Sequence, residues 1–166
     1  MALWTADIAP WLGIAASTLA AGGTSGPPGS NNALFGRVIL GVALSATHIG
    51  INITASSGNI CVAVYRNTGS NITSVPGSRV STSGSVACPA VGYTAVTISP
   101  AVYVGPGDWL AFAADNATAA IGVTYTQRAG GGATTSPLFG FGSASFPLPT
   151  TASMLSCAFQ PELYAY

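Results

Sequence analysis

The sequence predicts an all-β fold, an antiparallel β-sandwich whose number of strands best fits a jelly roll. Short apolar segments, several with a period of two, recur at roughly 8 to 12 residue spacing after residue 32, with turn residues between them. The chain contains 21 glycines and 11 prolines, and no segment of the body keeps the 3.6-residue period of a helix. Its 166 residues are enough for one domain with a substantial core.

The predicted strands follow one another along the whole body. They cover residues 34–44, 49–53, 60–65, 94–98, 102–104, 109–113 and 121–125, the alternating Phe139 and Phe141, and the region 153–166. The first segment is apolar nearly throughout, which indicates a strand buried on both faces or one bent at Gly36 and Gly41. The polar stretch 70–85 contains Pro76 and Gly77, a pair that predicts a turn.

Three parts make up the predicted domain organisation: an apolar N-terminal arm at residues 1–23, a Gly/Pro linker at 24–31 and a β-sandwich body at 32–166. No basic residue precedes the apolar run of the arm, as it would in a signal peptide, and the run is shorter than the ~20 residues of a membrane-spanning helix. Glycines and prolines predict no regular element in residues 22–31. We expect the arm to anchor the domain through its large apolar side chains, Trp4, Ile8, Trp11, Leu12 and Leu19.

Charged residues are rare in this chain. There are four basic and four acidic residues, 5% of the total, whereas an average soluble domain carries about 25%. A neutral surface with a net charge of zero favours association, so we expect burial in a homo-oligomer or a particle. The alternative is a free surface made wettable by Ser, Thr, Asn and Gly. Four scattered arginines cannot form the basic stripe that nucleic acid or an anionic membrane requires.

The sequence carries no enzyme signature, so we predict no catalytic residue and no cofactor. Asp108 and Asp115 are the candidates for paired carboxylates, but each lies at a predicted turn, where Asp is favoured for structural reasons. His48, the one histidine, is predicted to be a turn residue at a strand start. Neither a nucleophile elbow nor a phosphate-binding loop is present.

The cysteines predict no metal site. Cys61, Cys88 and Cys157 are far apart in the sequence, and none belongs to the closely spaced pair that zinc sites use. They are expected to be buried thiols, because free Cys is among the most buried residue types. One disulfide with a remaining free thiol is the alternative.

Several aromatic residues are candidates for a binding surface or an interface. Tyr65, Tyr93, Tyr103 and Tyr125 are amphipathic aromatics of the kind that stack on sugars or anchor interfaces. Packing in the core is the alternative for all of them. It is the favoured interpretation for Trp109, which lies within an apolar strand.

Two stretches of the sequence resemble a known family. One begins with Cys-Val-Ala-Val-Tyr-Arg-Asn at residues 61–67 and continues through Pro-Gly-Ser-Arg at 76–79 to residue 92. The other is Val-Gly-Pro-Gly-Asp-Trp-Leu-Ala-Phe-Ala-Ala-Asp-Asn at residues 104–116. Together they resemble a β-sandwich domain of virion proteins of tailed bacteriophages, particularly those of actinobacteria, over roughly residues 49–126.

The resemblance implies a structural role at the virion surface, on the exterior of the capsid. Such domains occur in capsid decoration proteins, head fibres and minor tail proteins, often as homotrimers. The arm would then contact major capsid or tail proteins. The alternative is a carbohydrate- or receptor-binding module of a tail fibre that recognises a host-surface glycan. A secreted trimeric sandwich like tumour necrosis factor, or a depolymerase, are more distant interpretations.

Overall fold

The computed structural model describes residues 15–16, 24–26, 32–38, 43–68, 75–125, 136–143, 146–152, 154–157, 159–161 and 163–166. The elements are β1 (Ala15–Ala16), β2 (Thr24–Gly26), β3 (Asn32–Arg37), β4 (Leu44–Ala55), β5 (Asn59–Thr68), β6 (Val75–Thr82), β7 (Val86–Ala87), β8 (Gly92–Val104), β9 (Trp109–Ala114), β10 (Ala120–Tyr125), β11 (Ser136–Ser143), β12 (Leu155–Cys157), β13 (Phe159–Pro161) and β14 (Leu163–Ala165). Every pairing between them is antiparallel. The prediction of an all-β antiparallel fold is therefore confirmed.

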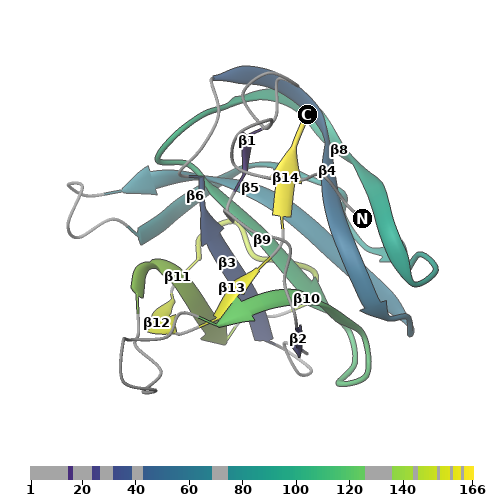
Figure 1. Cartoon of the computed structure of the whole chain (residues 1–166). Helices are drawn as coiled ribbons and strands as arrows, with labels where there is room; N and C mark the ends of the chain where they lie inside the picture. The colour runs from purple at the N-terminus through teal and green to yellow at the C-terminus, as the bar shows by residue number, and fades with distance from the viewer. Residues whose placement is uncertain are drawn as a thin grey trace.

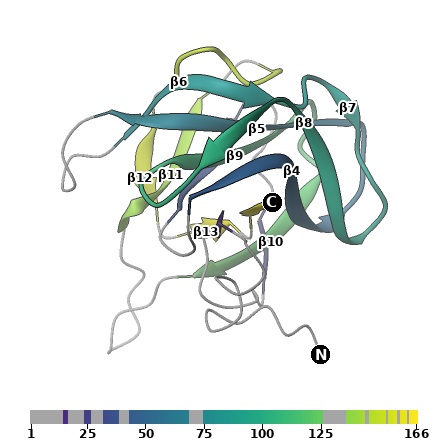
Figure 2. The same cartoon turned by 90° about the horizontal axis from the view of Figure 1, so that it is seen from above.

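The strands form two layers of one strongly curled sheet. In the first layer β1, β14, β4 and β8 lie side by side, and β10 joins the far end of β4. The second layer runs in the order β6, β5, β9, β3, β11 and β12. Thr82 of β6 pairs with Ser99 of β8 and connects the layers. The long strands β4 and β8 bend together along one side of the molecule (Figures 1 and 2).

The main core lies between the two layers. β4 shows why the sequence folds this way, because Ile49, Ile51 and Ile53 alternate along it and are all completely buried. Side chains in a strand point alternately to its two faces, so this period of two directs all three isoleucines inward. They share one cluster with Val62 of β5 and Phe112 of β9, from the opposite layer.

A second core covers the opposite face of β3, β5 and β9. Phe35, Tyr65 and Trp109 are fully buried there, packed with Leu148, Phe146, Ala152 and Met154. These three strands are therefore buried on both faces, which explains their nearly continuous apolar sequences. Of the predicted strand 34–44, residues 34–36 are buried and belong to β3, which ends at Arg37.

The region around Pro76 and Gly77 is a strand, so the predicted turn is wrong. Both residues belong to β6, where Pro76 pairs with Asn67 of β5. Proline has no N–H to donate to a neighbouring strand, and in sheets it is found at strand starts, edges and bulges. Pro76 is the second residue of β6, ahead of the bridge from Ser78 to Thr151 and of the pairing of Thr82 with β8.

Two further sequence predictions are wrong, one about the extent of β8 and one about the location of His48. Residues 92–104 form the single strand β8, where the sequence predicted two strands, 94–98 and 102–104. His48 lies within β4 rather than in a turn.

Short strands also occur in the segments predicted to be arm and linker. Ala15–Ala16 pairs with β14, and Thr24–Gly26 pairs with β10. The absence of regular structure predicted for residues 22–31 is therefore wrong at Thr24–Gly26. Strand pairing uses backbone groups, so these small residues can join a sheet without an apolar pattern. The five predicted anchoring side chains lie outside the described residues.

Candidate functional site: a tyrosine-lined groove

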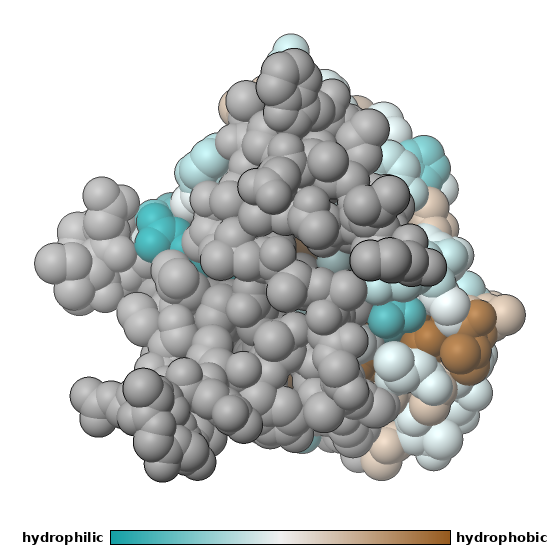
Figure 3. Space-filling view, viewed as in Figure 1, coloured by the Kyte–Doolittle hydropathy of each residue, from teal (hydrophilic) through white to brown (hydrophobic). Residues whose placement is uncertain are grey.

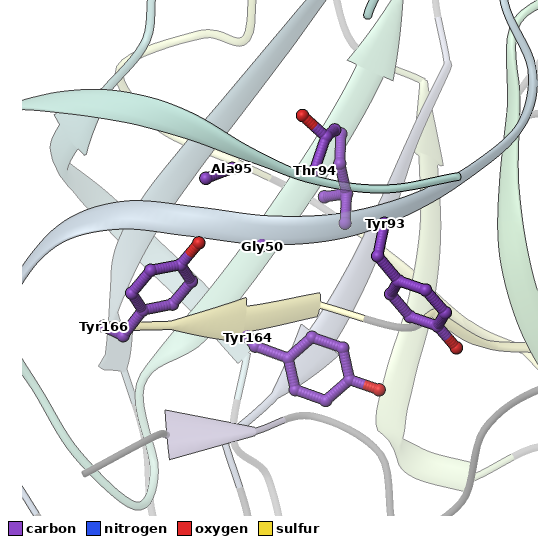
Figure 4. Close-up of a pocket in the computed structure, with 7 residues that line it drawn as sticks. Gly50, Tyr93, Thr94, Ala95, Tyr164 and Tyr166 are labelled. Atoms are coloured by element: carbon purple, nitrogen blue, oxygen red, sulfur yellow. The ribbon is translucent and has the colours of Figure 1, made fainter. Parts of the chain in front are cut away.

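A groove opens on the outer face of the first layer, where β4, β8 and β14 lie side by side. Its volume is about 210 Å³. Tyr93, Thr94 and Ala95 of β8 line it together with Gly50 of β4 and two tyrosines from the end of the chain, Tyr164 and Tyr166. Figure 4 shows the three tyrosine rings around Gly50, with the hydroxyls of Tyr93 and Tyr164 directed toward the same side.

A β-bulge in β4 fixes the position of Tyr166. The pairing of β4 with β8 shifts register between Ala46 and His48. At this shift the N–H groups of Thr47 and His48 both donate to the carbonyl oxygen of Tyr166, at 3.0 Å each, and the Tyr166 N–H donates to His48 at 3.1 Å. The His48 and Tyr166 rings also stack, with centroids 5.8 Å apart and planes 17° apart. Bulges commonly redirect side chains in this way.

Gly50 gives the groove its floor. In the sheet it lies between Ala95 of β8 and Tyr164 of β14, so small residues occupy two adjacent strands. A Cβ atom at residue 50 would lie 3.1 Å from Cε1 of Tyr166 and 3.7 Å from Cβ of Tyr164. The missing side chain therefore allows the Tyr166 ring to lie against the sheet, where it covers Gly50.

The four tyrosines predicted for binding have different locations. Tyr93 is 45% exposed and lines the groove. Tyr103 is 70% exposed, but it lies toward the other end of β8 and does not line the groove. Tyr65 is completely buried, so it has no surface to offer a ligand and the prediction is corrected for this residue. The backbone of Tyr125 belongs to β10, and its side chain lies outside the described residues.

Sequence reasoning did not identify Tyr164 and Tyr166 as site residues. Their spacing of two in a terminal strand places both side chains on one face, which was the available signal. The pairing that brings them beside Gly50 joins residues more than 100 positions apart. No local pattern reveals such a contact.

Tyr65 instead has a structural role in the second core. Its hydroxyl donates a 2.7 Å hydrogen bond to the carbonyl oxygen of Pro149, and its ring meets Phe35 edge-on at 5.8 Å. Burial raises the pKa of this phenol far above its ordinary value of 10.0, although the nearby Arg79 guanidinium acts in the opposite direction. Tyr65 therefore ties Pro149 to β5.

The raised pKa of Tyr65 predicts a loss of stability in alkali. The folded chain keeps this proton while the unfolded chain releases it near pH 10, so the free energy of unfolding should fall as pH rises above 10. Urea unfolding at pH 8 to 11 measures this slope. Tyr65→Phe should weaken the fold by about 1 kcal/mol at pH 8, through loss of one hydrogen bond, and should reduce the alkaline slope. An unchanged slope in the variant would contradict the assignment.

The two candidate acids do not form a catalytic pair. Asp108 and Asp115 lie just before and just after β9, seven residues apart along an extended chain, which separates them by about 23 Å. Asp108 accepts hydrogen bonds from Arg66 at 2.7 Å and from the Gly105 N–H at 3.1 Å. The Asn59 backbone N–H donates to Asp115 and, with the Asn59 and Asn116 side chains, lowers the pKa of that carboxyl. Both carboxylates therefore stabilise turns through hydrogen bonds.

Metal ligands and free thiols are the remaining groups that could give the described residues a chemical function. These ranges contain no group of three or more His, Cys, Asp or Glu residues placed to hold a metal ion. Cys61 and Cys88 are free thiols, of which Cys61 is buried and Cys88 partly buried.

No helix in this part of the chain is long and apolar enough to cross a membrane.

No protein-family model matches this chain, and no curated protein sequence matches it.

Proposed function

We propose that this chain is a structural virion protein of a tailed bacteriophage, a capsid decoration or head-fibre subunit at the outer surface of the particle. It acts by adhesion rather than by catalysis. The N-terminal arm makes contact with major capsid or tail proteins, and the β-sandwich body associates with other copies of the chain, most simply as a homotrimer.

The main support for this proposal is that the chain has few charged groups and that several of them bind other groups within the chain. Four charged groups among the described residues make contacts within the chain: Arg66 pairs with Asp108, Asp115 accepts from Asn59, and Arg79 donates to the Leu148 carbonyl. On the face in Figure 3 the coloured surface is mostly pale, that is, of intermediate hydropathy. Burying such a surface in an assembly costs little, because few charges lose water.

Two measurements on the full chain test this proposal. Light scattering during size-exclusion chromatography should give three times the 16.4 kDa of one chain. A cross-linker attached within residues 1–23 reports the contacts of the arm. In particles that contain the chain, cross-links should therefore join the arm to a capsid or tail protein. A stable monomer that forms no such cross-link would contradict the proposal.

A second candidate function is recognition of a host-surface carbohydrate. One observation favours it, namely that the exposed Tyr93 and Tyr166 flank a groove instead of packing inside the sandwich. The two functions are compatible, because a decoration or fibre protein can carry a receptor site. A glycan array probed with the full chain tests this candidate separately from the measurements of assembly.

A further inference from the structure

We propose that the groove between β4, β8 and β14 binds one uncharged saccharide ring, seated on the exposed Ala95 and held between Tyr93 and Tyr166. This inference rests on the second candidate function and assigns it a site and a class of ligand. The lining residues, the size of the groove and the contacts that hold Tyr166 support it.

The chemistry of the lining selects a neutral ligand. The described side chains that line the groove are neither acidic nor basic; they offer aromatic rings, phenolic hydroxyls, Thr94 and small residues, and His48 lies behind Tyr166. A tyrosine ring packs against the apolar C–H face of a pyranose, and its hydroxyl can bond to the hydroxyls at the sugar edge. A carboxylated or phosphorylated ligand would lose water here without gaining an opposite charge.

The shape of the groove favours a ring that lies flat. Gly50 and Ala95 face each other across β4 and β8, so no large side chain rises from the middle of the floor. The Tyr166 ring lies over Gly50, so the exposed Ala95 is the open part of this floor. Tyr93 and Tyr166 are 45% and 43% exposed and border it (Figure 4).

The size of the groove argues against a second copy of the chain as its occupant. The volume of about 210 Å³ is below the roughly 300–1,000 Å³ of sites for drug-sized ligands. A stable protein interface uses about 20–30 residues on each side. Seven residues line this groove.

The wall that Tyr166 forms is held in place before any ligand arrives. Its carbonyl oxygen accepts from the N–H groups of both Thr47 and His48, and its ring stacks on His48. A ring fixed by its own chain loses little conformational freedom on binding, which improves affinity. His48 is thus a positioning residue for the site.

Saturation-transfer NMR on the full chain, with methyl pyranosides as probes, tests the proposal. Neutral methyl glucoside, galactoside, mannoside and N-acetylglucosaminide are compared with glucuronic and sialic acids. We expect transfer from the protein to at least one neutral probe and none to the acids. Binding of the acids alone would overturn the choice of ligand class.

Variants inside and outside the groove test where the neutral saccharide binds. Tyr93→Ala should weaken binding of the neutral probe about tenfold, a loss that corresponds to one stacking contact. Gly50→Val should abolish binding, because its side chain fills the floor and displaces Tyr166. Tyr103→Ala, on the same strand but outside the groove, should leave affinity unchanged. Circular dichroism establishes that each variant is folded, and His48→Ala reports on Tyr166 if Gly50→Val does not fold.

The possible results separate this site from the broader function. If glycans bind but the groove variants bind equally well, carbohydrate recognition stands and this site is wrong. If no neutral saccharide binds to the array or in the NMR experiment, both are wrong, whereas the adhesive role is still decided by mass and cross-linking. If Tyr93→Ala dissociates an oligomer without affecting any sugar, the groove is an interface between copies and the proposal is overturned.

Discussion

Replacing Trp109 by alanine is expected to lower the free energy of unfolding by about 3–5 kcal/mol, the range for large aromatic residues removed from a core. Trp109 is completely buried, and its indole N–H donates to Asn67 at 3.4 Å. It lies in the sheet between Tyr65 of β5 and Arg37 of β3, so a cavity here weakens three strands together. A typical domain has only about 5–15 kcal/mol of stability in total.

Urea unfolding followed by far-ultraviolet circular dichroism measures this effect. Tyr103→Ala is the matched control, because Tyr103 is also aromatic but 70% exposed. Surface changes of this kind usually alter stability by less than about 0.5 kcal/mol. Equal unfolding midpoints for the two variants would show that the second core contributes little to stability.

Gly58→Ala is expected to destabilise the fold by clearly more than the backbone cost of a left-handed residue. Gly58 has a φ of 55°, where an L-residue costs about 1–2 kcal/mol. An added Cβ would also overlap Asp115 Oδ1 and Asn116 Nδ2. Asp115 accepts hydrogen bonds from the Asn59 N–H at 3.0 Å and the Asn59 side chain at 2.8 Å. Displacing this carboxylate breaks both bonds, so the loss exceeds the backbone cost.

Gly84→Ala measures the backbone cost of a positive φ without the clash that occurs at Gly58. Gly84 also has a positive φ, 65°, but no atom lies within 4 Å of the point that a Cβ would occupy, so only the backbone cost of about 1–2 kcal/mol applies. The pH dependence gives a second measurement. Asp115 has a lowered pKa, so its contribution exists above its ordinary 3.8 and disappears as pH falls through the folded value. Gly58→Ala should lose this acid dependence and Gly84→Ala should keep it.

The sequence by itself determined the class of fold. A period of two places side chains on one face wherever a strand occurs, so Ile49, Ile51 and Ile53 indicated both the strand and its buried face. The nearly continuous apolar sequence of β9 likewise reflects burial on both faces. β6 was missed because its sequence is largely polar and contains Pro76 and Gly77, which locally favour a turn.

Only the tertiary structure decided which tyrosines face solvent together. Tyr65 and Tyr93 look alike in sequence, yet Tyr65 is buried in the second core and Tyr93 borders the groove. Tyr166 reaches the same groove through the bulge at His48 and because Gly50 has no side chain where the Tyr166 ring lies. Composition and periodicity are local properties and fix the type of element. Contacts between distant strands depend on register and on bulges, which form only when the whole sheet pairs.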